Sequence, residues 1–404
     1  MPADNPADTT PQPPQTFQRA HVSFIAAGHA LHDTYTGFLP PLLPRLIESF
    51  TLSRTEAGLL TTFLQLPSLL QPFFGMLGDR ANLRWMVILA PAVTASLMSV
   101  LGWSNSYALL ALLLLAAGLS SAAFHATAPV LAGGLSGKQM GKGMGFWMVG
   151  GELGRALGPI IIVTALRFGD LKSSSWLMIP GILATLFLAV RLRRAPVVQS
   201  NQQFKGGWPA VRAILPLFIP LMGLIAARAM MLSAIATYLP TFLTESGSDL
   251  WTAGAALTLV ESAGIVGALL GGLASDRFGR NTILRAAMLA STVGMLLFLN
   301  LDGLLQMGAL LLTGFFSLSI APVIMAVVQE TYPEQRSLSN GIYMALSFVI
   351  RSAATVILGL IGDSINLYWA FTLSAAVMLV GMPLIQRLPA PAGIAERPSP
   401  ERSS

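Results

Sequence analysis

The chain has 404 residues, of which 54% are hydrophobic and 10% charged, with a mean hydropathy of +0.67 and a formal net charge of +6. Soluble globular domains carry about 25% charged residues, so this composition excludes a water-soluble domain and indicates a surface that faces lipid. The absence of Cys excludes disulfides and thiolate metal sites, and four scattered His residues predict no metal or cofactor.

Twelve stretches are apolar and long enough to cross a bilayer as helices, which takes about 20 residues each. We therefore expect an all-α membrane protein with twelve transmembrane helices. Residues 1–20 are rich in Pro, Thr, Asp and Gln, which predicts a disordered tail and not a signal peptide. The expected spans are 21–46, 55–78, 85–102, 106–134, 142–167, 175–191, 213–244, 251–274, 283–300, 304–330, 338–361 and 366–387.

Lys and Arg are distributed unevenly between the two sides of these spans. The tails and every second loop hold 17 of them, whereas the alternate loops hold four, namely Arg45, Arg54, Arg167 and Lys172. By the positive-inside rule we expect both termini to lie in the cytoplasm. We expect the protein to span a cell membrane, with the inner membrane of a bacterium as the simplest case. The basic balance reflects topology, so it does not require a nucleic acid partner.

Short matches recur between the two halves of the chain in the same order. The segment FLP at 38–40 returns as YLP at 238–240, GMLGDR from Gly75 returns as GLASDR from Gly272, and GFWM at 145–148 returns as GIYM at 341–344. The last match aligns Arg155 with Arg351. We expect two parallel six-helix bundles, with a binding site between them near the middle of the membrane. The expected parts are the bundles 21–191 and 213–387, a cytoplasmic linker 192–212, and tails 1–20 and 388–404.

Two loop segments, GMLGDRANLR (75–84) and GGLASDRFGR (271–280), resemble the loop signature of the major facilitator superfamily. That signature is Gly, three residues, Asp, Arg, one residue, Gly and Arg, and the first copy departs from it at Asn82. The resemblance implies the major facilitator fold and a gating role as a cytoplasmic latch that stabilises the outward-open state. The residues to which it assigns this role are Gly75, Asp79, Arg80, Gly272, Asp276, Arg277, Gly279 and Arg280.

Four longer segments resemble the fosmidomycin-resistance-type exporters within that superfamily. They are GHALHDTYTGFLPPLLP in the first span, FLQLPSLLQPFFGMLGDR in the second, FHATAPVLA in the fourth and FWMVGGELGRALGP in the fifth. The resemblance implies proton-driven efflux of a small compound, with an anionic, phosphonate-like one as the expected case. It also implies that Gly158 and Pro159 allow the bending used in alternating access. Close helix packing is the other interpretation of this glycine-rich segment.

Ionisable side chains at the bilayer centre cost about 2.5–3.5 kcal/mol each on insertion scales, so each needs a partner or a function. Three acids and three arginines stand in such positions, and structural ion pairing explains their balance as well as function does. Glu152 and Arg155, three residues apart, can pair locally on one helix. The full set is Asp33, Glu152, Glu261, Arg155, Arg228 and Arg351.

His29, His32 and Asp33 lie at i, i+3 and i+4, which places them on one face of the first helix. A carboxylate whose arginine partner changes between two states binds a proton in one and loses it in the other. We therefore expect Asp33, with its histidines, to carry the proton, and Glu152 is the rival carrier. Hydrogen bonding of the imidazoles to neighbouring helices remains the alternative.

Arginine favours bidentate contacts with phosphonate, phosphate or carboxylate, so Arg155 and Arg351 predict an anionic or zwitterionic substrate. Arg228 has no charged counterpart in the first half, which favours a role in recognition. The remaining candidates for substrate contact are His125, Glu261, Tyr35, Trp147 and Tyr343, each with a packing or structural role as the alternative.

The sequence therefore predicts a monomeric, proton-coupled antiporter that exports a small organic compound by alternating access. Uptake by proton symport or facilitated diffusion stays open, because residue types do not fix direction. A transporter-like membrane receptor is the rival from another class, although the tails are short. An enzyme is not expected, because the chain has no phosphate loop, metal-ligand cluster or Gly-x-Ser-x-Gly segment.

Overall fold

The computed structural model describes residues 16–80, 84–193, 208–331 and 336–388, and these residues are almost entirely helical. The first half contains α1 (Arg19–Thr36), α2 (Leu39–Phe50), α3 (Arg54–Gln65), α4 (Gln71–Arg80), α5 (Arg84–Ser99), α6 (Tyr107–Gly134), α7 (Met140–Ala165) and α8 (Met178–Leu192). The second half contains α9 (Trp208–Ser233), α10 (Leu239–Glu245), α11 (Leu250–Phe278), α12 (Arg280–Asn300), α13 (Gly303–Thr331), α14 (Arg336–Ser364) and α15 (Leu367–Gly381).

Ten of the expected spans are helical stretches of 20 or more described residues that are apolar enough to cross a membrane. The first two are built from shorter helices. The first span consists of α1 and α2, which meet at Gly37, and in the second a 3₁₀ turn at Leu66–Leu70 separates α3 from α4. Pro67 lies in that turn and lacks the N–H that a continuous helix needs. The expected all-helical fold is confirmed for the described residues, and the first two spans are each built from two helices.

The first span of each half is interrupted at the same place. α1 ends at Thr36 just before the segment FLP, and the corresponding helix α9 passes into a π-helical turn, Ala234–Tyr238, just before α10. This turn ends at the first residue of YLP, the segment that repeats FLP. The two halves thus share an interruption at positions that the sequence repeats align.

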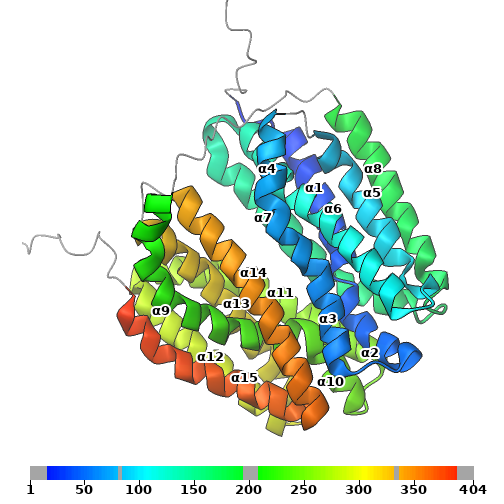
Figure 1. Cartoon of the computed structure of the whole chain (residues 1–404), viewed down its shortest axis with the longest axis vertical. Coiled ribbons are helices and arrows are strands. Elements are labelled where there is room, and N and C mark those ends of the chain that lie inside the picture. The colour runs from blue at the N-terminus through cyan, green and yellow to red at the C-terminus, as the bar shows by residue number, and fades with distance from the viewer. Residues whose placement is uncertain (1–15, 81–83, 194–207, 332–335, 389–404) are drawn as a thin grey trace, which may run out of the picture.

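The two halves have separate hydrophobic cores. Phe242, Phe298 and Phe371 pack together at the centre of the second core, and Leu42, Leu60 and Leu114 belong to the first. Figure 1 shows the helices of the first half on one side and those of the second half on the other, with α3 and α14 side by side at the junction.

The halves make their closest contacts at the end of the molecule where α3 begins and α14 ends, which we call the loop end. The Asp363 carboxylate accepts hydrogen bonds from the backbone N–H groups of Arg54 and Thr55, at 2.7 and 2.9 Å. The Arg54 Nε donates to Glu245 at 3.0 Å, and the Tyr238 hydroxyl donates to the Arg54 carbonyl at 3.1 Å. Backbone, side-chain and ionic contacts therefore close this end (Figure 1).

The opposite end, where α4 and α8 end and α9 begins, we call the terminal end. Here a Cβ atom added at Gly75, Gly141 or Gly145 of the first half, or at Gly341 of the second, would have no neighbour within 4 Å among the described residues. Helix α4 packs on α6 of its own half and makes no extensive contact with a helix of the second half in the described part of the chain. The two halves are therefore joined at the loop end and apart at the terminal end.

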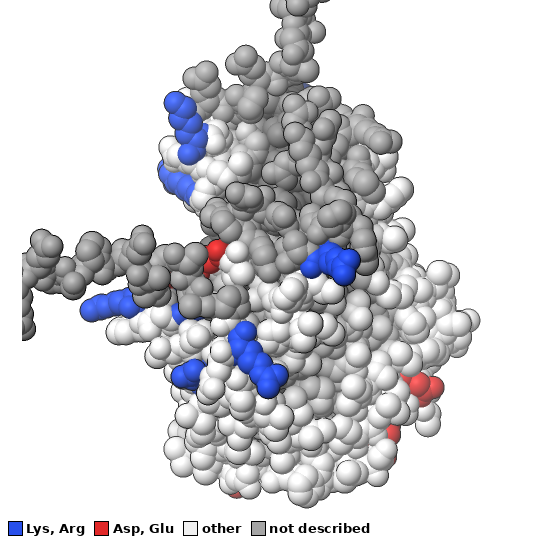
Figure 2. All heavy atoms as spheres, turned by 60° about the vertical axis from the view of Figure 1, so that its left-hand side comes forward, with Lys and Arg blue, Asp and Glu red and all other residues white. Residues whose placement is uncertain are grey.

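The outer surface suits a lipid environment. Leu186, Leu269 and Val380 are among the many large apolar side chains that are more than half exposed. Figure 2 shows Lys and Arg at the upper left and across the middle of that view, and a broad white surface with few charged side chains in its lower part. Because few charged groups interrupt this surface, the protein is a multi-pass membrane protein.

Candidate functional site

The site begins with the close packing of α1 on α7. A Cβ atom at Gly150 would lie 2.3 Å from the Ala26 carbonyl oxygen, and one at Gly154 would lie 2.1 Å from that of Ala30. A Cβ at Gly151 would lie 2.4 Å from the His29 ring. The glycines of α7 thus permit direct backbone contact, which supports the packing interpretation of this segment and fixes the polar face of α1 against α7.

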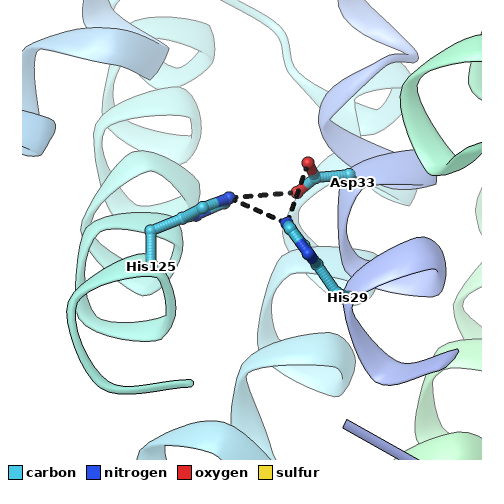
Figure 3. A group of neighbouring side chains, drawn as sticks. All are labelled: His29, Asp33 and His125. Carbon is cyan, nitrogen blue, oxygen red and sulfur yellow. Dashed lines mark hydrogen bonds and ion pairs between the residues drawn. The ribbon is translucent and has the colours of Figure 1, made fainter. Parts of the chain in front are cut away.

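Three polar side chains converge beside this contact. His29 Nε2 lies 3.3 Å from Asp33 Oδ2 and 3.2 Å from His125 Nε2, and His125 Nε2 lies 3.5 Å from Asp33 Oδ1. Figure 3 shows the three side chains pointing toward one another, His29 and Asp33 from α1 and His125 from α6. The side chains of His29 and Asp33 are 6% and 9% exposed and that of His125 is 30% exposed, so the cluster is accessible from the His125 side.

His32 lies outside this cluster although it shares the helix. Its ring is fully buried and stacks on Phe124 with the centroids 4.5 Å apart. Neither ring nitrogen makes a hydrogen bond of ordinary geometry to a described residue, although the Ala90 backbone is nearby. His32 is thus part of an aromatic layer, and Trp147 continues that layer by stacking on His29 at 3.5 Å.

A second group of charges lies next to the first and spans the two halves. Glu152 and Arg155 form an ion pair on α7, and their side chains are 24% and 40% exposed even though they stand deep in the fold. Arg155 also interacts electrostatically with Glu261 of α11 and with Asp33. Glu261 interacts in turn with Arg351 of α14. Positions 155 and 351, which the duplication relates, therefore contribute charges from the two halves to the same electrostatic group.

The arginines of the second half have unused hydrogen-bonding capacity. The Nε atoms of Arg228 and Arg351 are buried and have no hydrogen-bond partner among the described residues. The two guanidinium groups also repel each other, and Arg351 interacts unfavourably with Arg155. The three arginines are balanced by Glu152, Glu261 and Asp33, so the guanidinium nitrogens without a partner, and not an excess of charge, are what an anion could use.

Two of the aromatic candidates lie in the cores and not at the site. Tyr35 is 2% exposed and its hydroxyl donates to the Leu177 carbonyl at 2.6 Å, and Tyr343 is 3% exposed in the core of the second half. Trp147, by contrast, contacts the site through the stacking on His29 and through its carbonyl oxygen, which lies 2.9 Å from His29 Nδ1.

The loop motif of the second half forms a compact ionic contact. Arg280 binds Asp276 at 2.6 Å and Glu330 of α13 at 2.6 Å, and it donates to the Ser275 hydroxyl. Gly279 joins α11 to α12 with φ +90, a conformation that favours glycine.

The other residues expected to act in gating make no comparable ionic contact among the described residues. Arg277 lies over the ring of the neighbouring Phe278, and Gly272 has only Pro322 within 4 Å of an added Cβ. Gly158 packs on the Thr34 carbonyl, and Pro159 lies within the continuous helix α7. The side chains of Asp79 and Arg80, at the end of α4, fall outside the described part of the chain.

Sequence reasoning missed several residues that connect the elements. Glu330 completes the contacts of Arg280, and Asp363 and Glu245 hold Arg54. The segment SRTE at 53–56 signals a helix start, and a capping box is present there, but nothing in the sequence links it to Asp363. The four histidines also appeared too scattered for a metal site, whereas the fold brings His29 and His125 together.

The fold agrees with the comparisons to known proteins. The chain is 25% identical over 369 residues to the fosmidomycin resistance protein of Escherichia coli K12, covering 89% of this chain and 90% of that protein. It is also 25% identical to the membrane sensor protein UhpC of the same strain, covering 84% of each. A solved bacterial homologue of the human lysosomal transporter Spinster, inward-facing and occupied, matches with a TM-score of 0.74 at 14% identity, over 92% of this chain and 97% of that one.

The family model of the Major Facilitator Superfamily matches residues 25–304 and 252–403, and so covers almost the whole chain. This match confirms the resemblance seen in the loop motifs. Members of that family are membrane transporters of small molecules. The chain belongs to the major facilitator superfamily.

Proposed function

We propose that this transporter exports a small organic anion or zwitterion, of phosphonate-like chemistry, in exchange for protons. The observation that carries the proposal is the group of charges across the junction, in which Glu152 and Arg155 of one half interact electrostatically with Glu261 and Arg351 of the other. Buried ions are costly, so a transporter retains them where they bind cargo or protons. The likeness to the fosmidomycin resistance protein supports export as the direction and a phosphonate as the kind of substrate.

The arginines supply the affinity for the anion. Guanidinium groups bind phosphonate or carboxylate oxygens through paired hydrogen bonds, and here they come from both halves. The buried Nε atoms of Arg228 and Arg351, which have no hydrogen-bond partner among the described residues, favour a ligand that carries at least one negative charge. A ligand held by both Arg155 and Arg351 would connect the halves, and so would depend on their relative position.

Glu152 is the carboxylate best suited to couple protons to the substrate. It is accessible, it is paired with Arg155, and it stands closer to the arginine cluster than the more deeply buried Asp33. A substrate that offers a hydrogen-bond donor would use the ionised carboxylate as its acceptor. A proton on the same oxygen would remove that acceptor, so proton and substrate would compete, which is the requirement for antiport.

Alternating access follows from the arrangement of the halves. In the proposed topology both termini are cytoplasmic, so the open terminal end faces the cytoplasm and the closed loop end faces outward, in the inner membrane of a bacterium. Rocking of the two bundles about the site would open the other end. We propose that a monomer carries out the whole cycle.

Proton symport is the second candidate, and one observation favours it. A substrate without donor groups that draws Arg155 away from Glu152 would leave that carboxylate unpaired, and an unpaired buried carboxylate takes up a proton. Substrate and proton would then bind together. The two candidates differ in the direction of proton movement.

The test is transport by the purified protein in proteoliposomes with an imposed pH gradient. The panel contains small phosphonates, fosmidomycin among them, together with carboxylates and cationic drugs. We expect phosphonates to move in the direction opposite to the protons. The variants Arg155→Ala and Arg351→Ala should weaken the apparent affinity for them. The variants Arg155→Lys and Arg351→Lys should retain part of that affinity. Transport of cations alone, or unchanged affinity in both alanine variants, would refute the anion assignment.

A further inference from the structure

We propose that His29, Asp33 and His125 form a binding site for a single divalent transition-metal ion, such as Zn²⁺ or Co²⁺. One ligand atom from each residue can be chosen so that all three lie within 4.8 Å of one another. The proposal concerns the cluster in Figure 3 and does not depend on the substrate or on the proton carrier proposed above.

The hydrogen bonds at the far side of each ring fix which nitrogen faces the cluster. His29 Nδ1 lies 2.9 Å from the Trp147 carbonyl oxygen, and His125 Nδ1 lies 2.9 Å from the Ser121 carbonyl oxygen. A carbonyl oxygen only accepts, so each Nδ1 carries the hydrogen and donates it. In the neutral rings both Nε2 atoms then present lone pairs to the cluster, which is the arrangement of histidines that bind metals.

With both rings neutral and the hydrogen on each Nδ1, the cluster contains acceptors without a donor among them. The two Nε2 atoms face each other at 3.2 Å, and the Asp33 carboxylate adds two more acceptor oxygens. Asp33 Oδ1 is buried and makes no hydrogen bond within the described residues. Converging lone pairs repel one another unless a cation lies between them, and a metal ion would satisfy all three groups at once.

The spacing fits a first-row metal. Ligands at the 2.0–2.1 Å typical of zinc and nitrogen lie about 3.3 Å apart at the corners of a tetrahedron. The two Nε2 atoms lie 3.2 Å apart and His29 Nε2 lies 3.3 Å from Asp33 Oδ2, and both separations are close to that edge. The separation of 3.5 Å from His125 Nε2 is to the other oxygen of the same carboxylate, Oδ1. Two imidazoles and one carboxylate suit Zn²⁺, Co²⁺ or Ni²⁺, whereas Ca²⁺ and Mg²⁺ prefer oxygen ligands.

The surroundings hold the ligands and leave one direction open. Trp147 stacks on the His29 ring, and Gly151 lies against the same ring. These two contacts fix the position of the ring. The nearest positive charge, on Arg155, is paired with Glu152 and so opposes a bound cation less. The exposed side of His125 supplies the entry path and leaves a fourth position for water or another ligand.

The test is metal binding by the purified full-length protein in detergent, with any purification tag of histidines removed. We expect Zn²⁺ to bind at one ion per chain in calorimetry, and Co²⁺ to give the intense visible absorption of a tetrahedral site. We expect His125→Ala to weaken the affinity at least about tenfold. His125→Gln provides a second variant of similar size and polarity, should the alanine variant fold poorly.

The matched control is His21→Ala, which removes a histidine outside the cluster and should leave stoichiometry and affinity unchanged. Binding that persists in both His125 variants, or that is lost in His21→Ala, would overturn the proposal, and so would the absence of stoichiometric binding in the unaltered protein. Transport of phosphonates can succeed or fail independently of each of these results, so failure here leaves the proposed function standing.

Discussion

The contact between Asp363 and the start of α3 should control the closure of the loop end. Helix α3 begins with free backbone N–H groups, of which the Ser53 side chain accepts that of Glu56. Asp363, from α14 in the other half, accepts those of Arg54 and Thr55, and also the Thr55 hydroxyl at 2.6 Å. One half thus caps a helix of the other, and we expect Asp363→Ala to favour opening of this end.

The size of the effect follows from these bonds. A hydrogen bond to a charged group contributes about 1.5–3 kcal/mol to stability. The Asp363 side chain is 26% exposed, and water takes its place as the hydrogen-bond acceptor when the loop end opens. We therefore expect the whole cap to stabilise the closed loop end by about 2 kcal/mol. Since 1.4 kcal/mol corresponds to a factor of ten, the ratio of open to closed loop ends should rise about 30-fold.

The assay uses the absence of native Cys in this chain. Spin labels on Asn105→Cys of the first half and Ser246→Cys of the second report the distance across the loop end by double electron–electron resonance. Asp363→Ala should increase the long-distance population. Asp170→Ala, which removes a cap on Ser173 within the first half alone, is the control and should leave the distribution unchanged. Equal distributions in the Asp363→Ala and unaltered proteins would refute the capping argument.

Two further predictions concern packing and the loop motif. Gly151→Ala should lower the free energy of unfolding in detergent by about 1–3 kcal/mol, because its Cβ would lie 2.4 Å from the His29 ring. Gly145→Ala, which meets no neighbour within 4 Å, should be neutral or stabilising, and equal losses in both variants would contradict the close-packing account. Arg280→Ala should cost about 1–3 kcal/mol by leaving Glu330 without its partner. Arg280→Lys should recover part of this in the same measurement, and no loss in the alanine variant would show that the contact does not stabilise the fold.

The sequence predicts the fold well because its main signals are local or repeated. Apolar length indicates the spans, and the recurrence of FLP as YLP marks the interruption that both first spans share. The interruption at Pro67 was not anticipated, since a helix can bend at proline without changing type. Apolar length alone does not show where a helix changes to a 3₁₀ turn.

The candidate site is predictable only in part. The spacing of His29 and Asp33 at i and i+4 indicates their contact, and the spacing of Glu152 and Arg155 indicates their pairing. His32, three residues after His29, lies at the opposite edge of this helix face from Asp33. Its ring therefore packs against Phe124 and does not join the contact between His29 and Asp33. His125 is 96 residues from His29, so its contact depends on how α6 packs, and no local spacing encodes that.

The most direct test of the account is the direction of proton movement when the transported compound binds. The purified protein in weakly buffered detergent solution, with a pH-sensitive dye, should release protons on addition of the phosphonate that proteoliposomes transport best. Glu152→Gln should abolish the release while still binding the compound. Proton uptake would contradict antiport, and release that is unchanged in Glu152→Gln would contradict the role given to that carboxylate.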